Sequence, residues 1–372
     1  MALPDYLVKA SDRKAHPYHM WDGICGIENT LKSIRETYGK DGLSTGVLSA
    51  IARELAGKER IYFAGCGTSL YNGIAAQYIF NRIAGINVTA VYALEFTEFP
   101  PVNLEKSAVV GISHTGGTAS VIAALNKAKA GGAYTLAITD VEGSDITAVV
   151  DACLPNFGGR EPAMPKTRSY LAALMKIYFL AAAVASCRDR DCGDFLTDLK
   201  KIPEKAGAFL EKTEKTMKDL AEHQYRKVYL IGSGINLGSV SEAALKLQEA
   251  SQITAIPFEL EEVMHGPWVT MDSGDLVVIM HFDGLYQNKS LELIRSLNNL
   301  GVEQLIISNV SSFNEEVKQF FLIEDNEIMS PFYTVLPFYQ MAYFAALNKG
   351  HNPDYMRYHE EPYLKTRLTL PR

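Results

Sequence analysis

The 372-residue sequence predicts an α/β protein in which one domain, a parallel sheet with helices on both faces, occurs twice. Short apolar runs alternate with longer helix-forming segments, which is the pattern of consecutive βα units. The segment RIYFAGCGTSL at 60–70 recurs 167 residues later as KVYLIGSGINL at 227–237. This period is far longer than a solenoid repeat, so it indicates a duplicated domain.

The first copy is expected to alternate strands and helices along its whole length. Its expected strands are 60–64, 87–91, 108–112, 134–139 and 152–155. Its expected helices are 71–84, 119–130 and 167–187, and its longer loops are 95–102 and 158–165. Two earlier helices, 16–38 and 43–56, are expected to form an arm on the body or on a partner subunit. The predicted segments are therefore an arm (1–45), two domains (46–197 and 198–349) and a tail (350–372).

Three further matches place the second copy. Val88-Thr89-Ala90 is matched with Ile253-Thr254-Ala255, and Val109-Val110 with Val277-Val278. TLAITDV at 135–141 recurs 169 residues later as QLIISNV at 304–310. Four matches in one order at a nearly constant spacing support duplication, with the helical stretch 198–223 as the connector.

A cluster of hydroxyl residues follows the strand at 108–112. Ser113, Thr115 and Thr118, together with two glycines, stand where this strand passes into a helix. Such a junction directs backbone N–H groups and the positive end of a helix at one point, which suits a phosphate. The alternative is an ordinary Ser/Thr cap on a βα turn.

The second copy lacks this cluster. It has His281-Phe282-Asp283 at the position of Ser113-His114-Thr115, and Asp283 would repel an anion. It also has Ile235-Asn236 in place of Thr68-Ser69. A phosphate site is therefore expected in the first copy alone.

The stretch 241–272 contains candidates for acid–base chemistry. Glu242, Lys246 and Glu249 recur at spacings of four and three, which places them near one face of a helix. The alternative is a solvated face with an exposed ion pair. His265 precedes a rigid Gly-Pro turn and Trp268, although a lone loop histidine is often structural or merely exposed.

Composition limits the class of partner. The net charge of −7 disfavours nucleic acid and anionic membrane surfaces. Five scattered cysteines without a CxxC pair favour a reduced, cytoplasmic setting, and the N-terminus has no signal-peptide pattern. The apolar run 171–186 is interrupted by Lys176 and is expected to be a buried helix.

These motifs resemble the double sugar-isomerase (SIS) domain family, which includes the isomerase half of glucosamine-6-phosphate synthase. GCGTS at 65–69 and SHTGGT at 113–118 resemble its two phosphate loops. KTRSY at 166–170, ALKLQEAS at 244–251 and EVMHGP at 262–267 match further family segments in the correct order. The resemblance covers about residues 45–372. It implies two tandem SIS domains, each a three-layer α/β/α sandwich with a flavodoxin-like parallel sheet.

The resemblance also implies roles for individual residues. Glu249 would move a proton between C1 and C2 of the sugar, as an aldose–ketose shift requires, and His265 would assist ring opening from a neighbouring subunit. Lys365 is the candidate for a catalytic lysine in the tail, with Arg367 as a rival and an exposed, inactive lysine as the alternative. The phosphate would be held by five residues: Ser69, Ser113, His114, Thr115 and Thr118. Further substrate contacts would come from Gly67, Thr68, Thr167 and Lys246.

The sequence departs from the family pattern at several points. His114 replaces a Gln, Gly117 replaces a Glu, and Lys166 stands where the family often has Ser. Residue 2 is Ala2, so no N-terminal cysteine nucleophile is present and no glutaminase activity is expected.

The resulting expectation is an amino-sugar phosphate isomerase/deaminase that forms a homodimer and needs neither metal nor cofactor. It would interconvert glucosamine 6-phosphate with fructose 6-phosphate and ammonia. The alternatives are a fructosamine 6-phosphate deglycase, a simple phosphosugar isomerase and a non-catalytic sugar-phosphate sensor. Glu249 and His265 argue against a sensor, which needs no base.

Overall fold

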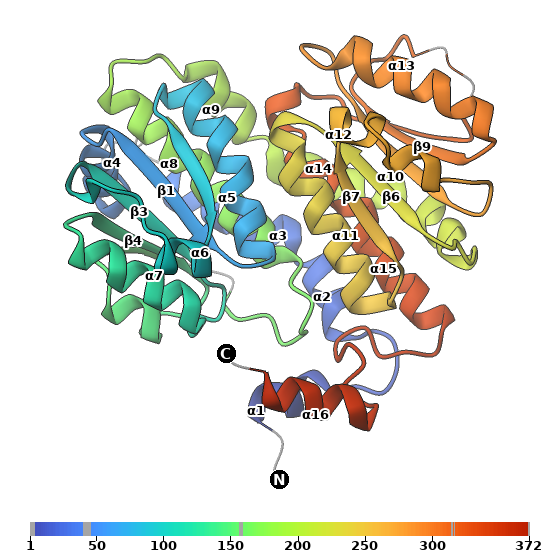
Figure 1. The fold of residues 1–372 in the computed structure, drawn as a ribbon, viewed down its shortest axis with the longest axis horizontal. Coiled ribbons are helices and arrows are strands. Elements are labelled where there is room, and N and C mark those ends of the chain that lie inside the picture. Colours follow the sequence, from blue (N-terminus) through green and yellow to red (C-terminus); the bar gives the residue numbers. More distant parts are fainter. Residues whose placement is uncertain (1–3, 40–45, 156–158, 314, 316, 371–372) are drawn as a thin grey trace. The chain divides into compact units, whose positions relative to one another are not determined.

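The computed structural model describes residues 4–39, 46–155, 159–313, 315 and 317–370. Within these, residues 4–24, 162–165 and 205–364 form one compact unit, which holds the second copy of the repeat. Residues 25–161, 166–204 and the end of the tail form the other, which holds the first copy. We call them the second-copy unit and the first-copy unit (Figure 1). The predicted N-terminal arm is thus divided between the two units.

The first-copy unit is built on a five-stranded parallel sheet with the strand order β2-β1-β3-β4-β5. Its strands are β1 (Arg60–Gly65), β2 (Val88–Tyr92), β3 (Ser107–Ile112), β4 (Tyr134–Thr139) and β5 (Ala152–Pro155). All six residues of β3 are buried, as expected for a central strand that helices cover on both faces.

Helices cover both faces of this sheet. One face packs against α6 (Ala93–Glu98) and α7 (Ala119–Ala130). The other helices are α3 (Ile27–Tyr38), α4 (Gly46–Ala56), α5 (Thr68–Ile79), α8 (Arg168–Cys187) and α9 (Gly193–Leu199). Short helical turns at 80–84, 104–106 and 145–148 complete the unit. The layers are those of an α/β/α sandwich (Figure 1).

Helix α8 forms the centre of the covering layer. It packs against α3, α4 and α5, and its residues from Ser169 to Ala185 are buried. Among the described residues, α8 is the one helix long and apolar enough to cross a membrane, and 89% of that window is buried within the protein. The prediction of a buried core helix over 171–186 is therefore confirmed.

The second-copy unit repeats the same sheet, with the strand order β10-β9-β8-β6-β7. Its strands are β6 (Val228–Gly232), β7 (Ala255–Glu259), β8 (Leu276–His281), β9 (Glu303–Ser308) and β10 (Gln319–Leu322). Its larger helices are α10 (Ile202–Glu222), α11 (Leu237–Ser251), α13 (Gln287–Leu297) and α15 (Leu336–Asn348). The shorter helices are α1 (Asp5–Ala10), α2 (His19–Cys25), α12 (Leu260–Met264) and α14 (Pro331–Thr334), and α16 (Glu361–Thr369) is divided between the two units after Leu364. Single turns lie at 234–236, 267–270, 298–300 and 327–329.

Strand register confirms the duplication and corrects one of its matches. Relative to the central strands β1 and β6, Val109 and Val277 hold equivalent positions, as do Thr135 and Gln304. The match of Val88 with Ile253 is wrong by two residues, because Val88 lies beside Ile61 whereas Ala255 lies beside Val228. Short β-branched matches are too common to fix a register.

Three predicted elements differ from the structure. The expected loop 95–102 begins with the helix α6, which Pro100 and Pro101 limit on its C-terminal side rather than exclude. The expected helix 16–38 is broken at Gly26 into α2 and α3, and the connector 198–223 spans the end of α9 as well as α10. The start of the expected helix 43–56 lies outside the described residues.

Candidate functional site

The loop after β3 is organised by its own hydroxyl groups. The hydroxyls of Ser113 and Thr118 lie 2.8 Å apart, and the Gly116 N–H donates to Ser113 Oγ at 3.1 Å. Thr118 thus stands at the N-cap position of α7 without a side-chain capping bond, and phosphate binding by this loop stays a prediction.

Gly116 is required in this loop. Its φ is +70°, and an added Cβ would lie 1.9 Å from Ser144 Oγ. Its carbonyl also accepts a hydrogen bond from Ile146 N–H at 2.8 Å. These contacts fix the loop between β3 and α7 before any ligand binds.

A second polar loop follows β1 and meets the first. Gly67 has a φ of +53° and precedes α5, whose first residues Thr68 and Ser69 are 8% and 7% exposed. Cys66 Sγ lies 3.4 Å from Ser120 Oγ in the first turn of α7, so the two loops are in contact.

The two loops together form the candidate phosphate site. Because β1 and β3 are parallel neighbours, their carboxyl ends bring the N-termini of α5 and α7 to one edge of the sheet. Helix N-termini and the N–H groups of tight turns attract anions. Thr115 is exposed there, whereas Ser69 and Ser113 are buried.

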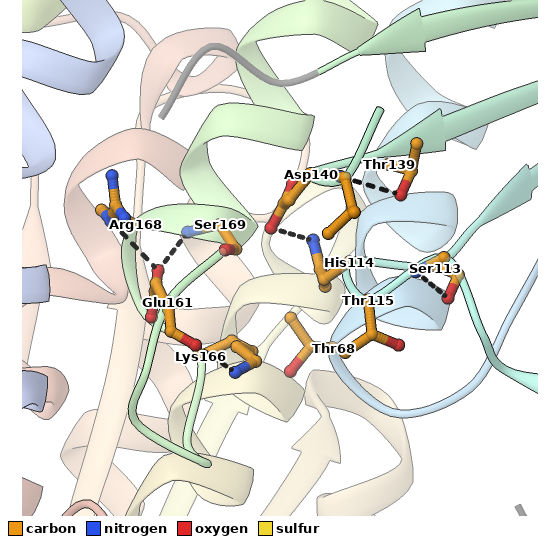
Figure 2. A network of polar contacts seen from close by, with 12 residues as sticks. Thr68, Ser113, His114, Thr115, Thr139, Asp140, Glu161, Lys166, Arg168 and Ser169 are labelled. Atoms are coloured by element: carbon orange, nitrogen blue, oxygen red, sulfur yellow. Dashed lines mark hydrogen bonds and ion pairs between the residues drawn. The ribbon is translucent and has the colours of Figure 1, made fainter. Parts of the chain in front are cut away.

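His114 lies behind this loop, in a buried polar network (Figure 2). Its Nδ1 is 3.3 Å from Asp140 Oδ2, and the two side chains are 7% and 2% exposed. Its carbonyl also accepts from the Asp140 N–H at 3.2 Å. Burial alone would raise the pKa of Asp140, but the His114 ring and the Lys176 ammonium hold that pKa below its usual value. Burial lowers the pKa of Lys176 to about 8, and Asp140 partly offsets the effect.

Glu161 holds the start of α8 next to this network. Its carboxylate accepts the N–H of Thr167 at 2.8 Å and that of Ser169 at 2.6 Å, which satisfies two donors at the helix terminus. Thr167 is fully buried. The Lys166 ammonium donates to the Glu161 carbonyl at 3.1 Å, and Arg168 lies 4.0 Å from its carboxylate (Figure 2).

The acid–base candidates of the second-copy unit share one face of α11. Lys246 Nζ lies 2.5 Å from Glu249 Oε2 and 3.5 Å from Glu242 Oε1. Glu242 and Lys246 are buried, whereas the Glu249 side chain is 21% exposed. Tyr339 of α15 donates to Glu242 at 3.3 Å. The alternative of a solvated ion pair is wrong for Glu242 and Lys246, because both side chains are buried.

His265 lies directly after α12 and is 71% exposed. Its Nε2 is 3.2 Å from Glu261 Oε1, and Lys289 of α13 binds the other oxygen of that carboxylate. Trp268, three residues on, is 42% exposed. The loop thus presents an imidazole and a large aromatic ring on the surface of the unit.

Lys365 lies in α16 and is exposed. Its rival Arg367 is half-buried on the same helix.

A family model of the SIS domain matches residues 54–183 and 223–349, which are the two copies of the repeat. The chain belongs to the SIS domain family. The two five-stranded sheets with their covering helices are its two SIS domains, as the sequence predicts.

Curated relatives carry this SIS pair within a longer chain. A glutamine–fructose-6-phosphate aminotransferase (isomerizing) of Clostridium tetani is 29% identical over 339 residues, covering 88% of this chain and 55% of the relative. The corresponding protein of Gloeobacter violaceus is 31% identical, covering 80% and 51%. This chain therefore spans about half the length of the curated relatives it matches.

Solved structures show the same SIS fold. The C-terminal domain of glucosamine-fructose-6-phosphate aminotransferase from Francisella tularensis has a TM-score of 0.84 and 20% identity, covering 91% of this chain and 99% of that one. Glucosamine-6-phosphate deaminase from Thermotoga maritima has a TM-score of 0.74 and 24% identity, covering 91% and 97%. Tagatose-6-phosphate ketose/aldose isomerase from Escherichia coli has a TM-score of 0.78 and 18% identity, covering 92% and 96%.

Sequence reasoning missed three residues of the first SIS domain. Asp140 directly follows β4, so the rule that neighbouring parallel strands end at one edge could have placed it beside His114. Lys176 was noticed only as an interruption of an apolar run. Glu161 lies in a loop rich in Gly and Pro, where no periodic pattern marks a buried carboxylate.

Proposed function

We propose that this SIS protein is an amino-sugar phosphate isomerase/deaminase that interconverts glucosamine 6-phosphate with fructose 6-phosphate and ammonia. The observation that carries the proposal is the α11 cluster. A partly exposed carboxylate, Glu249, is held 2.5 Å from the buried Lys246 ammonium. A protein that only binds a sugar phosphate needs no such base.

The phosphate is assigned to the loops of the first SIS domain. Their hydroxyl and backbone N–H groups are donors that a phosphate accepts, and no metal is needed if the phosphate anchors the sugar. Ser69, Ser113, Thr115 and Thr118 are the proposed hydroxyl ligands, and His114 is the proposed ring ligand. Gly67, Thr68 and Thr167 are the further substrate contacts proposed for this domain.

The chemistry requires one base that works on one face of the substrate. In the open-chain amino sugar, Glu249 would remove the proton from C2 while the C1 oxygen is protonated, giving an enolamine, and would return the proton to C1 while the amino group loses one. The product is the 2-imine of fructose 6-phosphate, and water then releases ammonia and the ketone. Lys246 would position Glu249, and Lys365 is retained as the candidate tail lysine.

His265 would move a proton between the ring oxygen and the hydroxyl at C1 during ring opening, because imidazole can act as acid and base near neutral pH. Its 71% exposure fits a residue completed by a second copy of the chain, so we propose a homodimer with the active site at the subunit interface. The five cysteines are free thiols, which supports a reducing compartment such as the cytoplasm.

Product analysis tests the reaction. The protein is incubated separately with glucosamine 6-phosphate, 6-phosphofructosyl-lysine and tagatose 6-phosphate, and ammonia, fructose 6-phosphate and glucose 6-phosphate are measured. Ammonia and fructose 6-phosphate from the first substrate are expected. Glucose 6-phosphate from the second would identify a deglycase instead. Tight binding of hexose phosphate without any turnover would show a sensor.

Substitution tests the base. Glu249→Gln keeps the shape of the side chain but removes the base, so turnover should fall by about 10² to 10⁴ while sugar-phosphate affinity is kept. Glu222→Gln, at an exposed position on α10, is the matched control and should leave turnover unchanged. Near-normal turnover by Glu249→Gln would refute the assignment.

Mixed dimers test the position of His265. Glu249→Gln and His265→Ala are each expected to be nearly inactive, but mixing and re-associating them should restore up to about a quarter of wild-type turnover by restoring one complete site in each mixed dimer. No recovery would place both residues in a site formed by a single chain.

A further inference from the structure

The His114–Asp140 pair has a feature that the phosphate loop alone does not explain. His114 is 7% exposed, and neither of its ring nitrogens makes a regular hydrogen bond to the residues that the structure describes. Nδ1 has the Asp140 carboxylate 3.3 Å away as an ion-pair contact, whereas no such contact is seen for Nε2 among those residues. A buried polar nitrogen without a partner is costly, whereas native proteins satisfy the great majority of such groups. The contact between His114 and Asp140 does not offset this cost, because buried ion pairs contribute little net stability.

The backbone fixes the direction of the pair. His114 stands between two residues of the phosphate loop, and its carbonyl accepts the Asp140 N–H at 3.2 Å. Asp140 Oδ2 faces His114 Nδ1 at 3.3 Å (Figure 2). Because a carboxylate only accepts hydrogen bonds, the nitrogen that faces it carries the hydrogen. The other ring nitrogen is then left for a different partner.

We propose that Asp140 is a positioning residue for the ligand phosphate: it holds His114 by Nδ1, so that Nε2 binds the anion at the loop 113–118. This inference rests on the proposed phosphate site. Lys176, buried in α8, compensates the charge of Asp140. Asp140 acts through the ring and is not itself a phosphate ligand.

Two substitutions of similar shape distinguish the roles of the two ring nitrogens of His114. The amide nitrogen of Asn stands at the position of His Nδ1 and that of Gln at the position of His Nε2. His114→Gln should therefore bind fructose 6-phosphate within about threefold of wild type. His114→Asn keeps the contact to Asp140 but loses the contact to the phosphate, and its affinity should fall about 10- to 100-fold, as for one charge-assisted hydrogen bond.

The decisive measurement is the effect of Asp140→Asn in two backgrounds. In wild type it should weaken fructose 6-phosphate binding about tenfold, because the ring is no longer held. In His114→Gln it should change binding less than twofold, since the Gln amide does not act through residue 140. Unphosphorylated fructose is the control ligand and should respond to neither change. Binding is measured by calorimetry.

Folding is controlled separately. Asp140→Asn leaves the Lys176 ammonium uncompensated, so the pair Asp140→Asn with Lys176→Met is measured alongside it. Equal losses from Asp140→Asn in both backgrounds, or wild-type affinity in His114→Asn, would overturn the inference and leave the proposed function standing. Failure of the wild type to bind fructose 6-phosphate would overturn both.

Discussion

Gly116→Ala is expected to damage the phosphate loop severely. The φ of +70° costs about 1–2 kcal/mol for a residue with a Cβ. The new Cβ would also lie 1.9 Å from Ser144 Oγ and 2.4 Å from Ser144 Cβ, and overpacking of this kind costs about 1–3 kcal/mol. Together these effects predict a loss of about 2–5 kcal/mol in the free energy of unfolding.

Gly117→Ala is the matched control, one residue away in the same loop. Within 4 Å, its Cβ would meet a single atom of the described residues, Asp145 Oδ2 at 3.9 Å, and its backbone is outside the left-handed region. A change within about 0.5 kcal/mol is expected. Urea unfolding of both variants, with fructose 6-phosphate affinity as a second readout, should show a large effect for Gly116→Ala alone.

A third variant separates the two causes. Adding Ser144→Gly to Gly116→Ala removes the clash but not the backbone strain, so about 1–2 kcal/mol of the loss should remain, relative to Ser144→Gly alone. Equal unfolding midpoints for the Gly116 and Gly117 variants would refute the reasoning. So would an unchanged loss after Ser144→Gly, which would show that the clash contributes nothing.

Three further predictions concern stability. Glu161→Ala leaves two buried N–H donors of α8 without an acceptor and should cost about 2–4 kcal/mol by urea unfolding, whereas Glu98→Ala, at an exposed site, should cost under about 0.5. Burial raises the pKa of Asp275, but its two hydrogen bonds from Arg226 hold that pKa below the usual value. The contribution of Asp275 to the free energy of unfolding is thus complete above its unfolded pKa and is lost as the pH falls through its folded pKa. Between pH 7 and pH 3 the urea unfolding midpoint of Asp275→Asn should therefore drop less than that of wild type. An equal drop in the two proteins would contradict this prediction. The folded pKa of Lys176, about 8, lies below its unfolded value. The free energy of unfolding of wild type should therefore rise by up to about 3 kcal/mol relative to Lys176→Met as the pH increases from 8 to about 10.5. Parallel pH profiles of unfolding for the two proteins would count against this prediction.

The fold was largely predictable because its strands are short apolar runs that directly precede polar turns. The matches at 60–70 and 135–141 each include such a run and the turn after it, so their register was right. Val88-Thr89-Ala90 offered only three residues of a partly exposed edge strand, where side chains face less uniform surroundings. Its match was therefore wrong by two residues.

The candidate site was predictable where function depends on residue type and less so where it depends on burial. Hydroxyls and glycines between a strand and a helix indicate an anion loop directly. Helical spacing placed Lys246 beside Glu249, but only the packing of other elements against α11 shows that Lys246 lies in the core. Asp140 contacts His114, which follows an adjacent strand and lies 26 residues away in the sequence, and no local pattern reveals such a pair.

The residue directly after the fourth sequential strand of each SIS domain contacts the loop after the neighbouring strand in both domains. In the strand register Asp140 corresponds to Asn309, and Thr115 to Asp283. Asn309 donates to Asp283 Oδ1 at 2.5 Å and accepts the Asp283 N–H at 2.9 Å, so it too ties the loop after the neighbouring strand. This contact between the two loops is thus present in both copies of the repeat. The side chain that is held in each copy determines the charge at that edge of the sheet. Under the proposal above, the imidazole held at one edge would bind an anion, whereas the Asp283 carboxylate held at the other edge would repel one.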